Sequence, residues 1–130
     1  MKVTLSNLAG FCPGVKRADA HVGELIKAGK EKIYTLGHLI HNRLYNEDLE
    51  KQGVHSIDIS EVEKIILENP ENKIRLVIRT HGIPKEQDKL LNFLENKYGN
   101  FTVSDMTWDW PCGVAYFGIC EAYRATGRQE

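Results

Sequence analysis

Short apolar runs of strand length alternate with segments of helical periodicity along the first hundred residues of the chain. The run Ile-Arg-Leu-Val-Ile-Arg at 74–79 is the strongest strand, and the helical pattern at 84–97 follows it directly. The residues of that helix expected to face the core are Leu90, Leu91, Leu94 and Tyr98. Strands separated by helices of this length predict right-handed crossovers. The expected fold class is therefore α/β, a three-layer α/β/α arrangement around a mainly parallel sheet.

The same periodicities predict the remaining elements and the division of the chain. Further strands are expected at 2–6, 33–36, 54–57 and 101–103, and further helices at 15–28, 42–52, 61–68 and 114–125. Ser60 is expected to cap the helix at 61–68, with Glu63 in the capping-box position. Both tryptophans and two of the three cysteines follow residue 104. The sequence predicts an N-terminal α/β domain over 1–100 and the start of a second domain, truncated or divergent, over 101–130.

Composition and charge exclude several classes of partner. The net charge is −1, whereas a protein that binds nucleic acid or an anionic membrane usually carries a clear basic excess. No apolar run approaches the roughly 20 residues that span a bilayer. The first six residues are too few and too polar for a signal peptide. We therefore expect a cytoplasmic protein with neither a nucleic-acid nor a membrane partner.

Cys12 lies between a predicted strand and a predicted helix, in the sequence Gly-Phe-Cys-Pro-Gly. The chain has three cysteines, an odd number too small for a disulfide framework, which points to buried thiols, metal ligands or catalysis. A helix N-terminus favours the thiolate, the form that attacks or ligates. Arg17 gives a Cys-x4-Arg spacing, one residue short of the cysteine phosphatase motif, and Pro13 lacks an amide that such a loop needs. Cys12 is a candidate metal ligand or nucleophile.

Two histidine segments follow other predicted strands. His81 lies in Arg-Thr-His-Gly after the strongest strand, and His41 lies in Leu-Ile-His-Asn after the strand at 33–36. Because the exits of parallel strands converge at one edge, Cys12, His41 and His81 are expected around one cleft. Such a cleft suits a metal or cluster beside an anionic substrate. His38 and His41 are three residues apart, but no cysteine or carboxylate follows at zinc-finger spacing, which argues against a closed zinc site.

These motifs resemble those of the 4-hydroxy-3-methylbut-2-enyl diphosphate reductase family. The segment Gly-Phe-Cys-x-Gly-Val at 10–15, followed by Arg-Ala, looks like the N-terminal signature of the family. The His41-Asn42 pair resembles its first histidine motif, and Arg-Thr-His-Gly at 79–82 resembles its second. All three occur in the order and spacing of the family, over roughly residues 1–107. The family is an iron–sulfur oxidoreductase that ends the methylerythritol phosphate route of isoprenoid biosynthesis.

The resemblance implies a reductive dehydroxylation of an allylic diphosphate to isopentenyl and dimethylallyl diphosphate. In the family a [4Fe-4S] cluster is held by three cysteines, one from each of three similar α/β domains, and one iron stays open for the substrate hydroxyl. Ferredoxin or flavodoxin delivers the electrons one at a time. By this resemblance Cys12 is a metal ligand, and His41 and His81 hydrogen-bond the diphosphate. The chain is then one domain of a multi-domain reductase plus the start of a second, and no catalytic residue is assigned.

The chain departs from the family pattern after Thr107. The family has Asp-Ala-Thr-Cys-Pro there, whereas this sequence reads Asp-Met-Thr-Trp-Asp-Trp-Pro-Cys. Either Trp110 stands where the thiol belongs, or Cys112 is the second metal ligand in a longer loop; Cys112 is the candidate. Cys120, about 12 Å along a shared helix, is too far away to replace a third ligand. The third cysteine and the catalytic Glu of the family have no counterpart here, so the chain is expected to be incomplete as a reductase, as a truncated, frameshifted or divergent form.

Two other classes of function remain open from the residues. A small non-catalytic α/β module could bind a phosphate-bearing ligand or a partner protein at the same cleft. A thiol enzyme could use Cys12 as its nucleophile. Metal-free diphosphate binding would favour the module, and selective alkylation of Cys12 with loss of turnover would favour the thiol enzyme.

Overall fold

Four parallel strands form the sheet, in the order β2-β1-β3-β4. The computed structural model describes residues 13–79 and 82–104. The strands are β1 (Lys32–Leu36), β2 (Val54–Ile57), β3 (Ile74–Ile78) and β4 (Phe101–Ser104). Five register pairs join β1 to β3, and the last of them sets Leu36 opposite Ile78. The parallel sheet expected from the alternation of strands and helices is confirmed.

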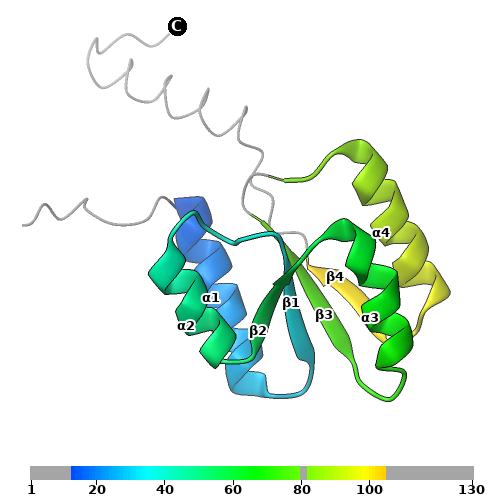
Figure 1. The fold of residues 1–130 in the computed structure, drawn as a ribbon, viewed down its shortest axis with the longest axis horizontal. Helices are drawn as coiled ribbons and strands as arrows, with labels where there is room; N and C mark the ends of the chain where they lie inside the picture. Colours follow the sequence, from blue (N-terminus) through cyan, green and yellow to red (C-terminus); the bar gives the residue numbers. More distant parts are fainter. Residues whose placement is uncertain (1–12, 80–81, 105–130) are drawn as a thin grey trace, which may run out of the picture.

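Helices cover both faces of this sheet (Figure 1). The helices are α1 (Pro13–Ala28), α2 (Arg43–Lys51), α3 (Val62–Glu68) and α4 (Lys85–Lys97), with a short 3-10 helix η1 (Ile59–Glu61) before α3. One buried cluster joins α1 and α2 to the sheet through Ala18, Val22 and Leu49. A second cluster joins α3 and α4 to the other face through Val62, Ile66, Leu91 and Leu94. The described residues therefore form the expected three layers.

The strands supply both halves of the core because successive side chains point to opposite faces. In β3, Leu76 and Ile78 belong to the cluster under α3 and α4, while Val77 between them belongs to the cluster under α1 and α2. All three are at most 1% exposed. A strand buried on both faces is typical of parallel sheets, and it explains why the residues at 76–78 are all apolar.

The element boundaries agree with the sequence pattern to within one or two residues, but two expectations about single side chains were wrong. Ser60 does not cap the helix: the backbone N–H of Asp58 donates to the Glu61 carboxylate at 2.8 Å, so the capping interaction sits two residues earlier, around η1. Leu90 was expected in the core but is 41% exposed, whereas Leu91 and Leu94 are each 1% exposed. The buried face of α4 is therefore narrower than its three leucines suggested.

The strand Phe101–Ser104 belongs to the same sheet as β3. Phe101 is 3% exposed and pairs with Ile74, so these residues extend the first domain beyond residue 100. The expected strand at 2–6 and helix at 114–125 lie outside the described residues. The assignment of the chain beyond Ser104 to a second domain stays a prediction. Within 13–79 and 82–104, no helix is both long and apolar enough to cross a membrane.

Gly53 and Gly23 differ in backbone conformation, so replacing each of them with alanine should change the stability in opposite directions. Gly53 ends the turn after α2 with φ +84°, a conformation that costs an L-residue about 1–2 kcal/mol. Gly23 lies inside α1, and a Cβ built there meets nothing within 4 Å. We expect Gly53→Ala to lower the free energy of unfolding by about 1–2 kcal/mol, and Gly23→Ala to raise it by about 0.5–1 kcal/mol. Urea denaturation of both variants checks the pair, and equal changes would contradict the assigned conformations.

The ion pair between Arg75 and Glu31 gives the fold a pH dependence. The Arg75 Nε donates to Glu31 Oε2 at 2.8 Å, and this hydrogen bond lowers the pKa of Glu31 below its ordinary 4.5. A carboxyl whose folded pKa is depressed stabilises the fold above the unfolded pKa, and that contribution is lost as the pH falls through the folded pKa. We expect wild type to lose more stability than Glu31→Gln between about pH 5.5 and about pH 3. Parallel slopes in urea titrations across that range would contradict the pairing.

Candidate functional site at the carboxyl edge of the sheet

The exits of β1 and β3 form the switch point of the sheet. After β1 the chain enters α2 on one face, and after β3 it enters α4 on the opposite face. Adjacent parallel strands whose connections depart to opposite faces leave a crevice outside their carboxyl ends, where α/β proteins bind ligands. Since Leu36 pairs with Ile78, the next residues of the two strands are Gly37 and Arg79. The crevice therefore begins at these two residues.

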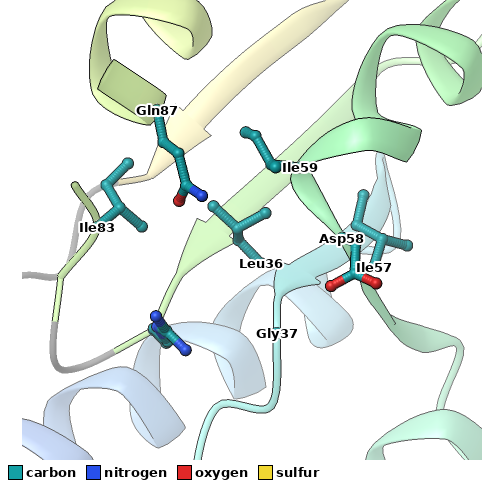
Figure 2. A pocket seen from close by; sticks show the side chains of 8 residues that line it. Leu36, Gly37, Ile57, Asp58, Ile59, Ile83 and Gln87 are labelled. Carbon is teal, nitrogen blue, oxygen red and sulfur yellow. The ribbon is translucent and has the colours of Figure 1, made fainter. Parts of the chain in front are cut away.

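A small cavity of about 110 Å³ lies at this edge (Figure 2). Its lining comes from the ends of three strands and the start of α4: Leu36, Gly37, Ile57, Asp58, Ile59, Arg79, Ile83 and Gln87. Figure 2 shows the Gln87 side chain extending from α4 toward Leu36. Aliphatic side chains share the lining with a guanidinium, a carboxylate and an amide, and the lining is more polar than apolar. Such a mixture can hold a small polar group, with room for only a few atoms.

His41 projects from a loop that is fixed on both sides. Leu39, two residues earlier, is 2% exposed and belongs to the core under α1 and α2. The Ile40 carbonyl accepts hydrogen bonds from Asn42 N at 2.9 Å and from Asn46 Nδ2 at 3.0 Å. The side chain of Asn42 then caps α2 by accepting from Tyr45 N at 3.1 Å. His41 is exposed on this anchored loop, so its imidazole is available to a ligand.

A hydrogen bond between Tyr45 and Asp19 joins α2 to α1. The Tyr45 hydroxyl donates to Asp19 Oδ1 at 2.7 Å. Burial raises the pKa of Tyr45 well above its ordinary value of 10, and the hydrogen bond to Asp19 raises it further. The phenol therefore keeps its proton throughout the physiological range and remains a donor. This contact links the helix that follows Cys12 to the helix that follows His41.

The structure describes some of the candidate site residues and not others. Cys12 directly precedes α1, and His81 lies between Arg79 and Gly82, but Cys12, His81 and Cys112 fall outside the described residues. Their roles stay predictions. His41 and His38 are described, and both are exposed in the loop between β1 and α2. Among residues 13–79 and 82–104, no three His, Cys, Asp or Glu side chains gather closely enough to hold a metal ion.

Three contributors to the edge were missed by sequence reasoning. Arg79, Gln87 and the Asp19–Tyr45 hydrogen bond depend on which segments meet across the sheet, and that is set by register rather than by local sequence. One signal was available for Arg79, since a charged residue directly follows the most buried strand. No comparable local signal marks Asp19 or Tyr45, which lie 26 residues apart.

The chain is an α/β domain with a parallel sheet, and it has a small cavity at the carboxyl edge, where domains of this class bind their ligands. The chain belongs to the LytB protein family, whose model matches residues 3–107. This confirms the relationship inferred from the cysteine and histidine motifs.

The relatives carry the same name as the family that the motifs resemble. The chain is 44% identical over 98 residues to the 4-hydroxy-3-methylbut-2-enyl diphosphate reductase of Caldanaerobacter subterraneus subsp. tengcongensis, an alignment that covers 75% of this chain and 31% of that one. It is 34% identical over 110 residues to the Opitutus terrae protein of that name, covering 82% and 38%. The chain thus spans about a third of the length of these relatives.

Solved structures of the same enzyme share the fold. A structure of (E)-4-hydroxy-3-methyl-but-2-enyl diphosphate reductase, the terminal enzyme of the non-mevalonate pathway, matches with a TM-score of 0.60 at 30% identity, covering 95% of this chain and 39% of that one. The reductase structure from Plasmodium falciparum matches with a TM-score of 0.60 at 26% identity, covering 91% and 33%. Both solved chains are much longer than this one.

The Tyr45–Asp19 contact can be tested by removing one oxygen. We expect Tyr45→Phe to lower the free energy of unfolding by about 1 kcal/mol, because the ring stays in place while a hydrogen bond to a carboxylate is lost at a largely exposed site. Asp19→Asn keeps an acceptor for the hydroxyl and should cost less. Chemical denaturation of both variants gives the comparison. A larger loss for Asp19→Asn would show that the carboxylate acts through another contact.

Proposed function

We propose that this chain provides the N-terminal domain of a 4-hydroxy-3-methylbut-2-enyl diphosphate reductase. The family match over residues 3–107 carries the proposal, because it covers all of the described residues and all three sequence motifs. It ends at Thr107, where the sequence departs from the family pattern. The geometry supports it: His41 lies on an anchored loop that follows the exit of β1, and the Arg-Thr-His-Gly motif continues from the exit of β3, the strand that pairs with β1. The reaction breaks the allylic C–O bond with two electrons and two protons, and it releases water.

The proposed role of His41 and His81 is to hold the diphosphate. Diphosphate oxygens need hydrogen-bond donors, and imidazole N–H groups supply them without the long, flexible stem of lysine. His41 is exposed, and its loop is fixed by the buried Leu39 and by the Asn42 cap. Pre-ordering of this kind lowers the entropic cost of binding, because the loop need not be organised when the ligand arrives.

The proposed cofactor is a [4Fe-4S] cluster, for which Cys12 has suitable donor chemistry. Such clusters take cysteine thiolates, and Cys12 stands directly before a helix of 16 residues, at the end that favours an anionic ligand. When bound, the cluster supplies one-electron chemistry at an iron open to the substrate. We propose Cys12 as one ligand and Cys112 as the second. A third thiolate must come from another domain or chain, so the 130 residues alone are not expected to reduce substrate.

The proposal extends to partner and compartment. A ferredoxin or flavodoxin is the expected one-electron donor, since the two electrons of the dehydroxylation arrive singly. The substrate is a small allylic diphosphate. We propose a cytoplasmic location, in keeping with the near-neutral charge of the chain and with a water-soluble diphosphate substrate.

Anaerobic iron–sulfur reconstitution tests the assignment of Cys12. We expect the chain to gain iron and sulfide with a brown charge-transfer absorption, and Cys12→Ser to lose most of it. Cys120→Ser is the matched control, because it removes another thiol of the same chain and should leave the absorption unchanged. Retention of the full absorption by Cys12→Ser would contradict the ligand assignment. Turnover of the allylic diphosphate by the 130-residue chain would contradict its incompleteness.

A non-catalytic module is the second candidate function, favoured by the small cavity at the carboxyl edge, which Arg79 and Gln87 line with groups that need no metal to bind a ligand. Calorimetry with inorganic pyrophosphate, in the absence of iron and reductant, separates the two. Tight metal-free binding that is lost in His81→Ala supports the module. Binding that appears only after reconstitution supports the reductase domain.

A further inference from the structure

Arg79 joins the exits of the two central strands. A Cβ built on Gly37 would lie 3.8 Å from Arg79 Nη1 and 4.0 Å from Arg79 Cδ, so the arginine side chain lies against the backbone of the β1 exit. The Nε of the same side chain donates to the Gly82 carbonyl at 3.4 Å. In return the Gly82 N–H donates to the Arg79 carbonyl at 3.1 Å. One side chain therefore contacts the ends of both β1 and β3.

The backbone at Gly37 makes room for this contact. Its φ of +70° lies in the left-handed region that glycine adopts without strain, and its N–H donates to the Ile57 carbonyl at 2.9 Å. The chain thus turns immediately after β1, with no side chain between the turn and the guanidinium. Four residues later it reaches His41. The position of Arg79 and the direction in which the His41 loop leaves the sheet are therefore linked.

The rest of the guanidinium is not used in an ion pair within the described chain. Asp58 lines the same cavity, yet no carboxylate among residues 13–79 and 82–104 pairs with Arg79. Elsewhere on the sheet, Arg75 makes a close two-point pair with Glu31. The two arginines therefore have different partners: Arg75 in β3 pairs with a carboxylate, whereas Arg79 at the β3 exit lies against the backbone at two strand ends.

We propose that Arg79 is a positioning residue that sets the β1 exit, and through it the His41 loop, for binding the diphosphate. This inference rests on the proposed function for its ligand, but the ordering of the loop can be measured without any ligand. The guanidinium is required, because it presents the Nε–H to the Gly82 carbonyl while its Nη1 lies close to Gly37. A lysine at this position keeps the charge but has neither the Nε–H that donates to Gly82 nor the Nη1 that lies near Gly37.

Amide hydrogen exchange of the ligand-free chain tests the ordering directly. We expect Arg79→Met and Arg79→Lys to raise exchange in residues 37–42 by about fivefold or more, because one hydrogen bond and its packing are lost. Exchange in α3 should stay unchanged. Lys89→Met is the matched control, since it removes an exposed positive charge from α4 and should alter neither segment. Unchanged exchange at 37–42 in Arg79→Met overturns the inference.

Calorimetry with inorganic pyrophosphate on the reconstituted chain tests whether this ordering serves the site. We expect Arg79→Met to weaken pyrophosphate binding about fivefold, and Arg79→Lys to bind no better than Arg79→Met. In a His41→Ala background, Arg79→Met should weaken binding less than about twofold, because the effects of residues that act through one another are not additive. Rescue by lysine, or full additivity with His41→Ala, would overturn positioning. If the unmutated chain binds no pyrophosphate, the proposed function fails, and hydrogen exchange alone decides whether Arg79 orders the loop.

Discussion

The pairing of β1 with β3 is the constraint on which the rest of the structure depends. These strands begin 42 residues apart in the sequence, at Lys32 and Ile74, and lie side by side in the sheet. The chain between them leaves by α2, forms β2 and returns through α3 over the opposite face. Right-handed crossovers require this change of face when the strand order reverses. The crevice between the two exits is a consequence of the topology, and the side chains decide what it can bind.

Buried leucine and backbone hydrogen bonds allow an exposed histidine to have a defined position. Leu39 contributes roughly 2–3 kcal/mol of apolar burial, and it lies only two residues before His41. The Ile40 carbonyl and the Asn42 cap restrain the residues on either side of the histidine. The free energy that orders this loop is therefore supplied by the core. The proposed ligand at His41 would meet a loop that is already held in place, without the histidine itself having to be buried.

Sequence reasoning predicted the layers well, because each strand carries its own period-two or continuous apolar signal. The strand Val54–Ile57 agrees at both ends, and the helix before β1 differs only by two residues at its start. Leu90 was misassigned because Leu91 and Leu94 already fill the buried stripe of α4, and the adjacent Leu90 lies outside that stripe. The contacts at Arg79 and between Tyr45 and Asp19 could not be predicted, since they follow from register and helix packing between distant segments.

The structure explains how this domain can fold as a unit while the proposed site depends on groups from outside it. Its two buried clusters are formed by the described elements themselves, one on each face of the sheet. The groups proposed to bind ligand lie instead on the loops of one edge, where no further layer of described structure covers His41. A parallel sheet of this size offers few exits, and here the described exits supply an imidazole and a guanidinium. An iron–sulfur cluster requires several thiolates within a few ångströms. A second and third domain facing this edge would add those thiolates without disturbing either buried cluster.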